Sequence, residues 1–419
     1  MPVLNLKNGK IYCIMKKAYA AIKKEGSMRI AIFGGSFDPI HTEHVRLAEF
    51  AIAELNLDKL LLMPAYAPPH KKGKTLSPDE DRLAMCRLAT AHLDKVEVSD
   101  YEIAKKGVSY TYLTCKHFYE LYKDEDVELF WLVGTDMLRD FPTWKNPQEI
   151  LSYATLAVCG RNENGAWIEK EQERFVRLFE KKFVYLSYNG RDVSSTKIRV
   201  LAGAGMRLTQ LVPPCIEEYI EDKGLYKIAF ADKALSLQTP KRQAHSLRVA
   251  ELAAKRATSL QIPEQTAIEA ALLHDCGKNL EDNSPYLEGF ALPTEWGQVP
   301  KEVAHQFIGA FLCEKYFKIT DEEILNAVRY HTSGRPNMGT LEKLIFLADM
   351  LEPERHYDCV DTLRSLFWKD IDECLRVALL ETLKFLQKKG GEVYPLTQAA
   401  YEFYAKNKNI GENYGRDYK

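Results

Sequence analysis

The sequence predicts two folds in series: an α/β doubly wound parallel sheet of the Rossmann-like type, then an all-α helical bundle. The chain has 419 residues, more than one core usually spans, since domains cluster at roughly 100–200 residues. From Arg29 onward, short apolar runs alternate with amphipathic helical stretches, which implies crossovers and a parallel sheet. After about residue 228 the strand patterns end and the periodicity is helical almost to the C-terminus.

Six strands are expected in the first half, at residues 29–33, 59–64, 96–100, 128–134, 155–160 and 183–188. Between the second and the third, Ser77 is predicted to cap a helix, with Pro78 at its first position and Glu80 three residues after the cap. We therefore expect a helix that runs through residues 81–93.

The strand patterns stop between Tyr226 and Lys241, where we place the domain boundary. The first 27 residues lack the long apolar stretch and the small-residue cleavage site of a signal peptide, so we interpret them as an extension before the fold. The expected organisation is an N-terminal extension at 1–27, a first domain at 28–227, a linker at 228–240, a second domain at 241–405 and a polar tail at 406–419.

The composition, with 46% hydrophobic and 28% charged residues, is that of a soluble globular protein. A net charge of −2 provides no field that would attract nucleic acid or an anionic membrane, and no apolar run approaches the roughly 18 residues of a membrane span. The nine cysteines never form a Cys-x-x-Cys pair, which favours reduced thiols in a cytoplasmic protein. We expect small-molecule partners, and a homo-oligomer is compatible with this composition.

The segment GGSFDPIHTEH, residues 34–44, follows the first expected strand and opens a helix, which is where a doubly wound sheet presents ligands. Gly34 and Gly35 would let backbone amides approach phosphate oxygens, and the helix points its positive end at the same place. His41 and His44 would share one face of the first helical turn. There they could donate hydrogen bonds to a triphosphate and to departing pyrophosphate. A plain glycine turn with two incidental histidines is the alternative.

This segment resembles the signature of the nucleotidyltransferase superfamily, in which His-x-Gly-His ends the motif. Later blocks are similar, in the same order, to those of the bacterial nicotinate mononucleotide adenylyltransferases. The resemblance covers about residues 28–227 and implies transfer of AMP from ATP, with Mg²⁺, to nicotinate mononucleotide. The blocks are PAYAPPHK at 64–71, GVSYTYLT at 107–114, VGTDML at 133–138 with Trp144, and SSTKIR at 194–199.

The resemblance implies that the phosphate of nicotinate mononucleotide attacks the α-phosphorus of ATP directly. His41, His44 and Lys71 would spread the charge of that catalytic step, and positioning with electrostatics suffices, so no protein nucleophile is expected. One residue departs from the family motif, because Glu43 stands where the family has glycine. Its bulk and negative charge are expected close to where ATP passes.

Substrate contacts are expected from the remaining blocks. By resemblance, Tyr110, Thr111 and Trp144 bind the pyridine ring and its carboxylate, and an indole face suits an electron-poor ring; a buried core tryptophan is the alternative. Asp136 helps to position the nucleotide, and His70 belongs to a basic loop after the second strand. The expected substrate-binding residues are Gly34, Gly35, Ser36, Phe37, His70, Tyr110, Thr111, Gly134, Asp136, Trp144, Ser195, Thr196 and Arg199.

The helical half contains a second group of candidate residues, each in or at the end of an expected helix. Side chains from several helices can converge inside a bundle, and the adjacent pair His274-Asp275 is the strongest single signal. Isolated core histidines are the alternative interpretation. The expected metal ligands are His245, His274, Asp275, His305, His331 and Asp349.

This set resembles the HD superfamily of metal-dependent phosphohydrolases. Four of the residues match its basic ligand set, and His305 and His331 resemble its binuclear branch. HTSGRPNM at 331–338, followed by ADMLEPER at 348–355, is similar to the small bacterial HD proteins that hydrolyse diadenosine tetraphosphate symmetrically. The match covers about residues 235–400. It implies two divalent metals, and imidazole with carboxylate ligands suits iron or manganese.

The implied chemistry is hydrolysis of a dinucleoside polyphosphate. Two ions that share Asp275 would lower the pKa of a bridging water, and the resulting hydroxide would attack an internal phosphate, giving two ADP from diadenosine tetraphosphate. Asp275 is therefore the expected catalytic residue of this half. Lys278 and Arg355 are candidate phosphate contacts, and solvated surface positions are an equally good interpretation of them.

Other interpretations keep the folds and change the function. The first half could adenylylate another phosphate acceptor, such as phosphopantetheine, and the second could cleave other nucleotides or cyclic dinucleotides. Alternatively, one half is a catalytically inactive nucleotide-sensing or scaffold module. The block GVSYTYLT with Trp144 favours nicotinate, and the complete ligand set argues against an inactive second half.

Overall fold

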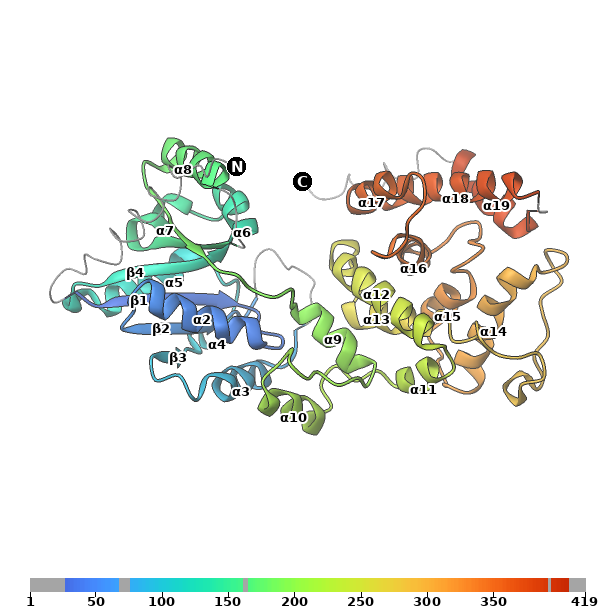
Figure 1. Ribbon diagram of the computed structural model, residues 1–419, viewed down its shortest axis with the longest axis horizontal. Coiled ribbons are helices and arrows are strands. Elements are labelled where there is room, and N and C mark those ends of the chain that lie inside the picture. Colours follow the sequence, from blue (N-terminus) through green and yellow to red (C-terminus); the bar gives the residue numbers. More distant parts are fainter. Residues whose placement is uncertain (1–26, 68–75, 161–164, 391–392, 407–419) are drawn as a thin grey trace, which may run out of the picture. The chain divides into compact units, whose positions relative to one another are not determined.

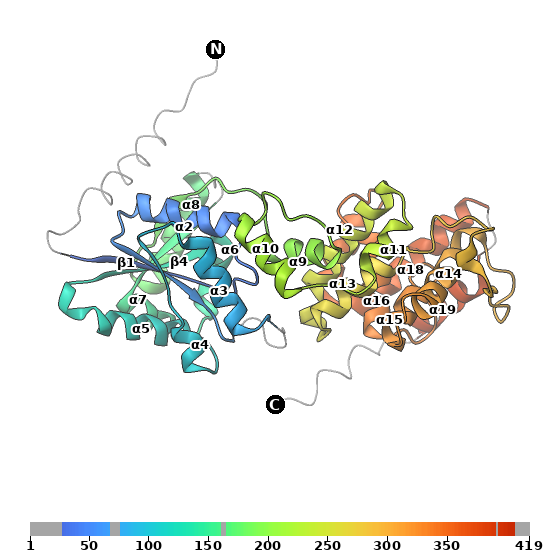
Figure 2. The same cartoon turned by 90° about the horizontal axis from the view of Figure 1, so that it is seen from below.

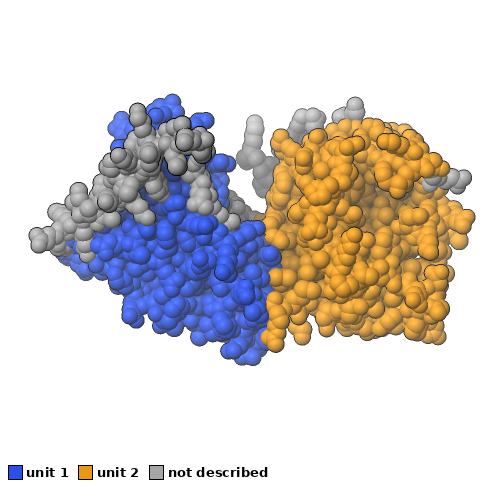
Figure 3. Space-filling view, viewed as in Figure 1, with its two compact units in different colours: residues 1–72, 76–198, 208–223 blue, residues 73–75, 199–207, 224–419 orange. Residues whose placement is uncertain are grey.

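The computed structural model of the protein describes residues 27–67, 76–160, 165–390 and 393–406. These residues divide into two compact units, coloured separately in Figure 3. The first unit holds residues 27–67, 76–160, 165–198 and 208–223, and the second holds residues 199–207, 224–390 and 393–406.

A six-stranded parallel sheet forms the middle of the first unit, in the order β3-β2-β1-β4-β5-β6. Each strand lies where an apolar run predicted one, and the expected fold class is confirmed. The interior strands are buried on both faces, which explains why their sequences are continuous apolar runs. The strands are β1 (Arg29–Gly35), β2 (Lys59–Pro64), β3 (Val96–Val98), β4 (Glu128–Gly134), β5 (Thr155–Gly160) and β6 (Val184–Ser187).

Helices cover both faces of this sheet. The helices of this unit are α2 (Thr42–Glu54), α3 (Asp79–Thr90), α4 (Tyr101–Lys105), α5 (Thr111–Leu121), α6 (Thr135–Asp140), α7 (Pro147–Tyr153), α8 (Gly165–Phe179) and α10 (Pro214–Lys223), and α9 (Ser195–Gly203) begins in this unit and ends in the second. Figure 2 shows α2 on one side of the sheet and α5 with α7 on the other. After β3 the chain returns to place β4 beside β1, so the carboxyl ends of β1 and β4 form the switch point where open α/β sheets bind ligands.

The start of α3 corrects one expectation. Pro78 is the residue before the helix, with φ −47° and ψ 140°, and no side chain caps α3, so Ser77 is not its cap. The carbonyl of Ser77 instead accepts a hydrogen bond of 3.2 Å from Nε of Arg82. The helix begins at Asp79 because the carbonyl of Pro78, and not that of Ser77, accepts the first helical hydrogen bond, from the backbone N–H of Arg82 over 3.1 Å.

Arg82 joins three loops at the carboxyl edge of the sheet. Its side chain is fully buried, and its guanidinium donates to the carbonyls of Ser36 (2.9 Å), Ala65 (2.8 Å) and Ser77. It also forms an ion pair with Asp79. A buried guanidinium is stable only with its donors and charge satisfied, so this residue fixes the turn after β1 relative to the end of β2.

The second unit consists of helices around a large core, with a smaller buried cluster that contains Val299, Phe307, Tyr394 and Leu396 (Figure 1). The segment predicted as a linker, residues 228–240, contains α11, whose Ala231, Ala234 and Leu235 are buried in that core. Buried alanines on α12 and α13 let these two helices pack closely. No described helix has the length and apolar composition needed to cross a membrane. The helices are α11 (Ala231–Ser236), α12 (Pro240–Ala257), α13 (Glu264–Leu273), α14 (Lys301–Lys315), α15 (Glu322–Arg329), α16 (Thr340–Leu351), α17 (Val360–Lys369), α18 (Ile371–Lys388) and α19 (Pro395–Lys406).

Replacing Arg82 should destabilise the first unit. Arg82→Met leaves the carbonyls of Ser36, Ala65 and Ser77 without this donor and Asp79 without its counter-charge. We expect the free energy of unfolding of this unit to fall by about 3 kcal/mol.

Urea denaturation in a Trp296→Phe, Trp368→Phe background measures this change, because the remaining tryptophans all lie in the first unit. Arg87→Met is the matched control, since Arg87 is exposed on the same helix, and should change the free energy by no more than about 0.5 kcal/mol. Equal denaturation midpoints for the two variants would contradict the role of Arg82.

Candidate phosphate-binding turn and metal centre

The predicted phosphate-binding turn lies at the carboxyl end of β1. Gly34 and Gly35 are the last two residues of the strand. A Cβ atom at Gly34 would lie 2.9 Å from the ring of Trp131, and one at Gly35 would lie 2.9 Å from the ring of Phe37. Both positions therefore require glycine for packing, because aromatic rings fill the space that a side chain would need.

His41 and His44 pair at the start of α2. The backbone N–H of His44 donates to Nδ1 of His41, and the backbone N–H of His41 donates to Nδ1 of His44, each over 3.3 Å. The two rings stack with centroids 3.5 Å apart, on one face as expected. Burial lowers the pKa of His41 to about 4, so this ring is neutral near pH 7. Because Nδ1 accepts in both rings, each neutral ring carries its proton on Nε2 and offers an N–H donor there.

The start of α5 lies at the same edge of the sheet. Tyr110 precedes the helix and Thr111 is its first residue. Just before them, the side-chain oxygen of Ser109 accepts a hydrogen bond of 3.1 Å from the N–H of Tyr66, which follows β2. The pair predicted to bind the pyridine group is thereby attached to the carboxyl end of β2.

The start of α6 and the turn after β1 hold four more predicted residues. Gly134 ends β4 and places Asp136, which is exposed, in the first turn of α6. Ser36 lies in the turn after β1 beside Phe37. Phe37 is buried and contacts the ring of His44 edge-on, with centroids 5.0 Å apart. Its side chain therefore packs under the histidine pair, and its burial leaves little surface for contact with a substrate.

Trp144 lies in the core, and two other predicted residues cannot be placed. Trp144 is only 9% exposed and packs in the core of the unit, with its ring centroid 5.3 Å from that of Phe141. This is the position that the alternative interpretation of a core tryptophan expected. His70 and Lys71 lie outside the described residues.

The predicted block at α9 divides between the two units. The hydroxyl of Ser195 donates to the carbonyl of Pro39 over 2.9 Å, so the start of α9 is attached to the turn after β1, and Thr196 follows in the first helical turn. Arg199 belongs to the second unit, where it is buried and forms an ion pair with Glu264. The structure therefore does not place Arg199 as a residue of the phosphate-binding turn.

All six predicted metal ligands come together inside the second unit. Their ligand atoms form three overlapping groups, each within 4.8 Å. The groups are His245, His274 and Asp275; His274, His331 and Asp349; and Asp275, His305 and His331. Helices α12, α14 and α16 carry His245, His305 and Asp349, while His274 with Asp275 follows α13 and His331 follows α15.

Backbone carbonyls orient two of the imidazoles. Nδ1 of His274 lies 2.6 Å from the carbonyl of Ala271, and Nδ1 of His331 lies 2.8 Å from the carbonyl of Val328. A carbonyl oxygen can only accept, so Nδ1 carries the proton and donates in both rings. Nε2 of each ring therefore keeps its lone pair, which is the form that ligates a metal ion.

A carboxylate orients His245 in the same way. Nδ1 of His245 donates to Glu352 over 3.0 Å, and Arg248 holds that carboxylate through hydrogen bonds of 2.6 and 3.2 Å. Burial alone would raise the pKa of Glu352, but Arg248, the Glu354 backbone N–H and His245 lower it to about 2. Nε2 of His245 lies 2.8 Å from Asp349.

The described residues fit a cation at this centre. Among them, neither the buried Nε2 of His245 nor that of His274 has a hydrogen-bond partner, although both lie beside carboxylates. Lone pairs of this kind facing negative oxygen atoms in a buried site are stable when a positive ion lies between them.

Asp275 divides the imidazoles into two pairs. Its Oδ2 lies 3.3 Å from Nε2 of His274 and 3.9 Å from that of His245, whereas its Oδ1 lies 3.3 Å from Nε2 of His305 and 3.5 Å from that of His331. One carboxylate is thus shared by two candidate ion positions.

Three cationic side chains surround these carboxylates. Arg242 donates to Oδ2 of Asp275 over 2.8 Å, and Arg355 donates to Oδ1 of Asp349 over 2.7 Å. Nζ of Lys278 lies 3.0 Å from Nδ1 of His305, and burial lowers the pKa of Lys278. Lys278 and Arg355 were candidate phosphate contacts from the sequence, and the structure adds Arg242.

Two further buried residues support the centre. A Cβ atom at Gly277 would lie 2.6 Å from the carbonyl of His305, so only glycine lets α14 pass this close to Asp275. Gln306 accepts hydrogen bonds from the N–H groups of Thr332 and Ser333, each over 3.0 Å, and so fixes the segment that follows His331. Gly277, two residues after Asp275, was visible in the sequence, whereas the partners of Gln306 are too distant along the chain for any spacing to indicate them.

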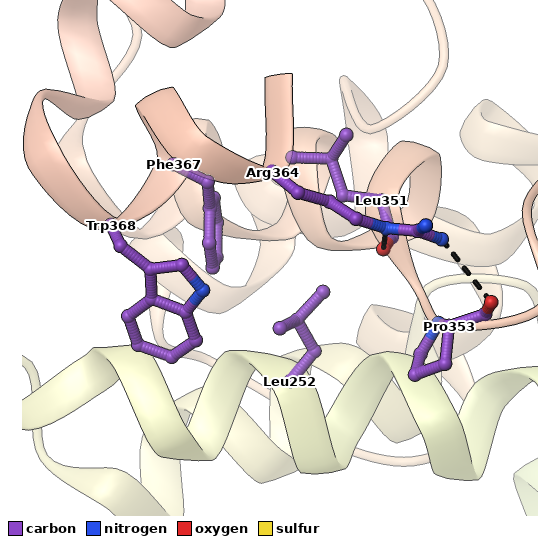
Figure 4. A pocket seen from close by; sticks show the side chains of 6 residues that line it. All are labelled: Leu252, Leu351, Pro353, Arg364, Phe367 and Trp368. Atoms are coloured by element: carbon purple, nitrogen blue, oxygen red, sulfur yellow. Dashed lines mark hydrogen bonds between the residues drawn. The ribbon is translucent and has the colours of Figure 1, made fainter. Parts of the chain in front are cut away.

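A pocket of about 310 Å³ opens beside the segment that carries Glu352, and none of the metal ligands lines it (Figure 4). Arg364 crosses this pocket and donates to the carbonyls of Leu351 (3.2 Å), Glu352 (3.0 Å) and Pro353 (3.2 Å). The arginine therefore fixes the segment after α16. The lining residues are Leu252, Leu351, Pro353, Arg364, Phe367 and Trp368.

Two family models match the chain. The cytidylyltransferase-like model matches residues 32–201 and the HD domain model matches residues 242–354. The first lies on the sheet and its helices, and the second spans all six clustered metal-ligand candidates.

Known proteins resemble each half and the whole. A protein of Clostridium botulinum described as "Probable nicotinate-nucleotide adenylyltransferase" is 39% identical over 203 residues, covering 48% of this chain and 98% of that protein. One of Mycoplasma genitalium, described as "Probable nicotinate-nucleotide adenylyltransferase/Ap4A hydrolase", is 28% identical over 369 residues, covering 86% and 98%. A crystal structure of a "predicted HD superfamily hydrolase involved in NAD metabolism" from Clostridium acetobutylicum is 32% identical, covering 42% and 96%, with a TM-score of 0.38. The chain therefore belongs to the nicotinate-nucleotide adenylyltransferase family, with an HD domain fused after the adenylyltransferase-type domain.

Proposed function

We propose that the first unit transfers AMP from ATP to nicotinate mononucleotide, giving nicotinate adenine dinucleotide and pyrophosphate. The observation that carries this proposal is the stacked pair of His41 and His44 at the N-terminus of α2, at the switch point of the sheet. The family to which the chain belongs supports the substrates.

In this reaction ATP enters as its magnesium complex. A phosphate oxygen of nicotinate mononucleotide forms a bond to the α-phosphorus of ATP, while the bond from that phosphorus to the oxygen bridging the β-phosphate breaks. The Nε2–H groups of His41 and His44 donate to the phosphate oxygens on which negative charge builds up, and the N-terminus of α2 adds its partial positive charge. Ser195 and Thr196, at the start of α9, complete the phosphate-binding side.

We further propose that the HD domain hydrolyses diadenosine tetraphosphate symmetrically. The observation that carries this proposal is the division of four imidazoles between the two oxygen atoms of Asp275. Two divalent ions, iron or manganese, held by the six ligands would supply positive charge that activates a water molecule and polarises a phosphate. The substrate follows the combined description of the Mycoplasma genitalium relative.

The cations around the centre have a defined task in this hydrolysis. Water adds to one internal phosphorus and the oxygen bridge between the two internal phosphates breaks, so two ADP molecules leave. Arg242, Lys278 and Arg355 would bind the phosphate oxygens, since a tetraphosphate brings several negative charges to the carboxylates that the two arginines now contact. These three residues thereby select a polyphosphate and hold its centre at the ligands.

Replacing His41 should slow the first reaction and leave the second unchanged. His41→Asn keeps an acceptor at the cap position of α2 but removes the Nε2–H donor. We expect kcat for nicotinate adenine dinucleotide synthesis to fall by roughly 10²- to 10³-fold. Chromatography of products from ATP and nicotinate mononucleotide measures it, and diadenosine tetraphosphate hydrolysis by the same sample is the folding control. Undiminished synthesis would refute the role of His41, and no synthesis by the wild-type protein would refute the proposed activity.

Replacing Asp275 should slow the hydrolysis and leave dinucleotide synthesis unchanged. Asp275→Asn removes the shared carboxylate, so we expect hydrolysis of diadenosine tetraphosphate with added manganese or iron to fall by at least roughly 10³-fold, while dinucleotide synthesis persists. Product analysis also tests the symmetry of cleavage, because ADP alone is expected. ATP with AMP would indicate asymmetric cleavage, and absence of any product from the wild-type protein under either metal would exclude this substrate.

Replacing Glu352 should weaken metal binding through His245. Glu352→Ala removes the acceptor that keeps the proton of His245 on Nδ1, and loss of such a partner typically weakens metal binding by roughly 10- to 100-fold. Titration of the metal-stripped protein with Mn²⁺ measures the affinity. Glu354→Ala is the control, since Glu354 is 69% exposed and contacts only Arg248 among the described ion pairs. Equal affinities of the two variants would show that Glu352 does not orient the ligand.

A further inference from the structure

Glu43, the residue that departs from the family motif, is buried and fully engaged in hydrogen bonds. One carboxylate oxygen accepts from the hydroxyl of Tyr188 over 2.8 Å and from the backbone N–H of Arg191 over 2.9 Å. The other accepts from the guanidinium of Arg46 over 2.8 Å. The side chain of Glu43 is only 6% exposed. The carboxylate thus faces the segment 188–191 within its own unit.

These hydrogen bonds stabilise the negative charge of Glu43, which was expected from the sequence to lie close to the path of ATP. Burial alone would raise the pKa of Glu43, but the hydrogen bonds from Tyr188, Arg191 and Arg46 outweigh it and lower this pKa. The N-terminal turn of α2 also favours a negative side chain. An ionised carboxylate that accepts from three donors holds the elements carrying those donors together. Its negative charge is balanced by these three hydrogen bonds.

The anchored segment leads directly into the start of α9. Residues 188–191 follow β6, and Ser195 then donates to the carbonyl of Pro39 over 2.9 Å. The chain from β6 to α9 is therefore attached twice to the turn and first helical residues after β1, once through Glu43 and once through Ser195. The ring of Tyr188 also packs against that of Phe50 on α2, with ring centroids 5.3 Å apart.

Gly190 shows how closely this segment approaches the carboxylate. A Cβ atom at Gly190 would lie 2.9 Å from Oε2 of Glu43 and 2.5 Å from the ring of Tyr188. Any side chain at this position would push the segment away. Glycine at residue 190 and glutamate at residue 43 therefore form one matched contact.

We propose that Glu43 is a positioning residue of the adenylyltransferase half, which holds segment 188–191 against α2. It thereby keeps Ser195 and Thr196 beside the pair of His41 and His44, so that both sets of phosphate donors face one nucleotide. This inference rests on the proposed adenylyl transfer. Glu43 itself contacts Tyr188 and Arg191 and acts on the substrate only through them.

Steady-state kinetics of dinucleotide synthesis separates positioning from other roles. Glu43→Ala should raise KM for ATP roughly tenfold, the effect expected for losing a buried hydrogen-bonded anchor, with a smaller change in kcat. Glu43→Gln keeps an amide oxygen that can accept from Tyr188 or Arg191 and should recover most of the affinity. Glu49→Ala, which removes an exposed carboxylate from the same helix, should match the wild-type protein.

Hydrogen exchange tests the anchor without turnover. In Glu43→Ala the amides of residues 188–196 should exchange faster, whereas those of the β1 strand should not change. An unchanged or lower KM for ATP in Glu43→Ala, or unchanged exchange in residues 188–196, would overturn the proposal. If the wild-type protein makes no dinucleotide, the proposed adenylyl transfer fails, and the exchange result still decides whether Glu43 anchors this segment.

Discussion

The position of the proton on each histidine ring is the constraint on which both sites depend, and the neighbouring group decides it. At the N-terminus of α2 the available groups are backbone N–H donors, so Nδ1 of His41 and His44 must accept and Nε2–H becomes a donor. At the ends of α13 and α15 the available groups are carbonyls, so Nδ1 of His274 and His331 must donate and Nε2 keeps a lone pair. The same side chain is thus prepared as a donor, which suits anions, at one helix end and as an acceptor, which suits cations, at the other.

The folds bring these helix ends to the places where such ligands can bind. In the sheet unit, parallel strands put the N-termini of α2 and α6 at one edge, and Arg82 fixes the connecting loops there. In the helical unit, glycine at residues 277 and 309 lets α14 approach the end of α13, since a Cβ atom at Gly277 would lie 2.6 Å from the backbone N of Gly309. Glycine at these two positions therefore allows close approach of the elements that carry the polar groups of the helical site.

Much of this arrangement could be predicted from the sequence, because its signals are local. All six strands followed from apolar runs, and the His-Asp pair pointed to the ligand cluster because both residues are adjacent. The contacts that could not be predicted join distant residues: His245 and Glu352 are 107 positions apart, and Glu43 and Tyr188 are 145 apart. The cap assigned to Ser77 was wrong, because Pro78 occupies the cap position and Ser77 lies one residue before it.

The charge balance of the helical site connects its ligands to its substrate. Two carboxylates, Asp275 and Asp349, lie among the imidazoles of this site. Arg242 and Arg355 contact these same carboxylates from the rim. Metal ions bound between the imidazoles and the carboxylates would balance the negative charge of the carboxylates. The N–H groups of each arginine could then donate to a polyphosphate. A rim of this kind would couple the two proposed events, since the carboxylates that would hold metal ions are the ones that the arginines contact.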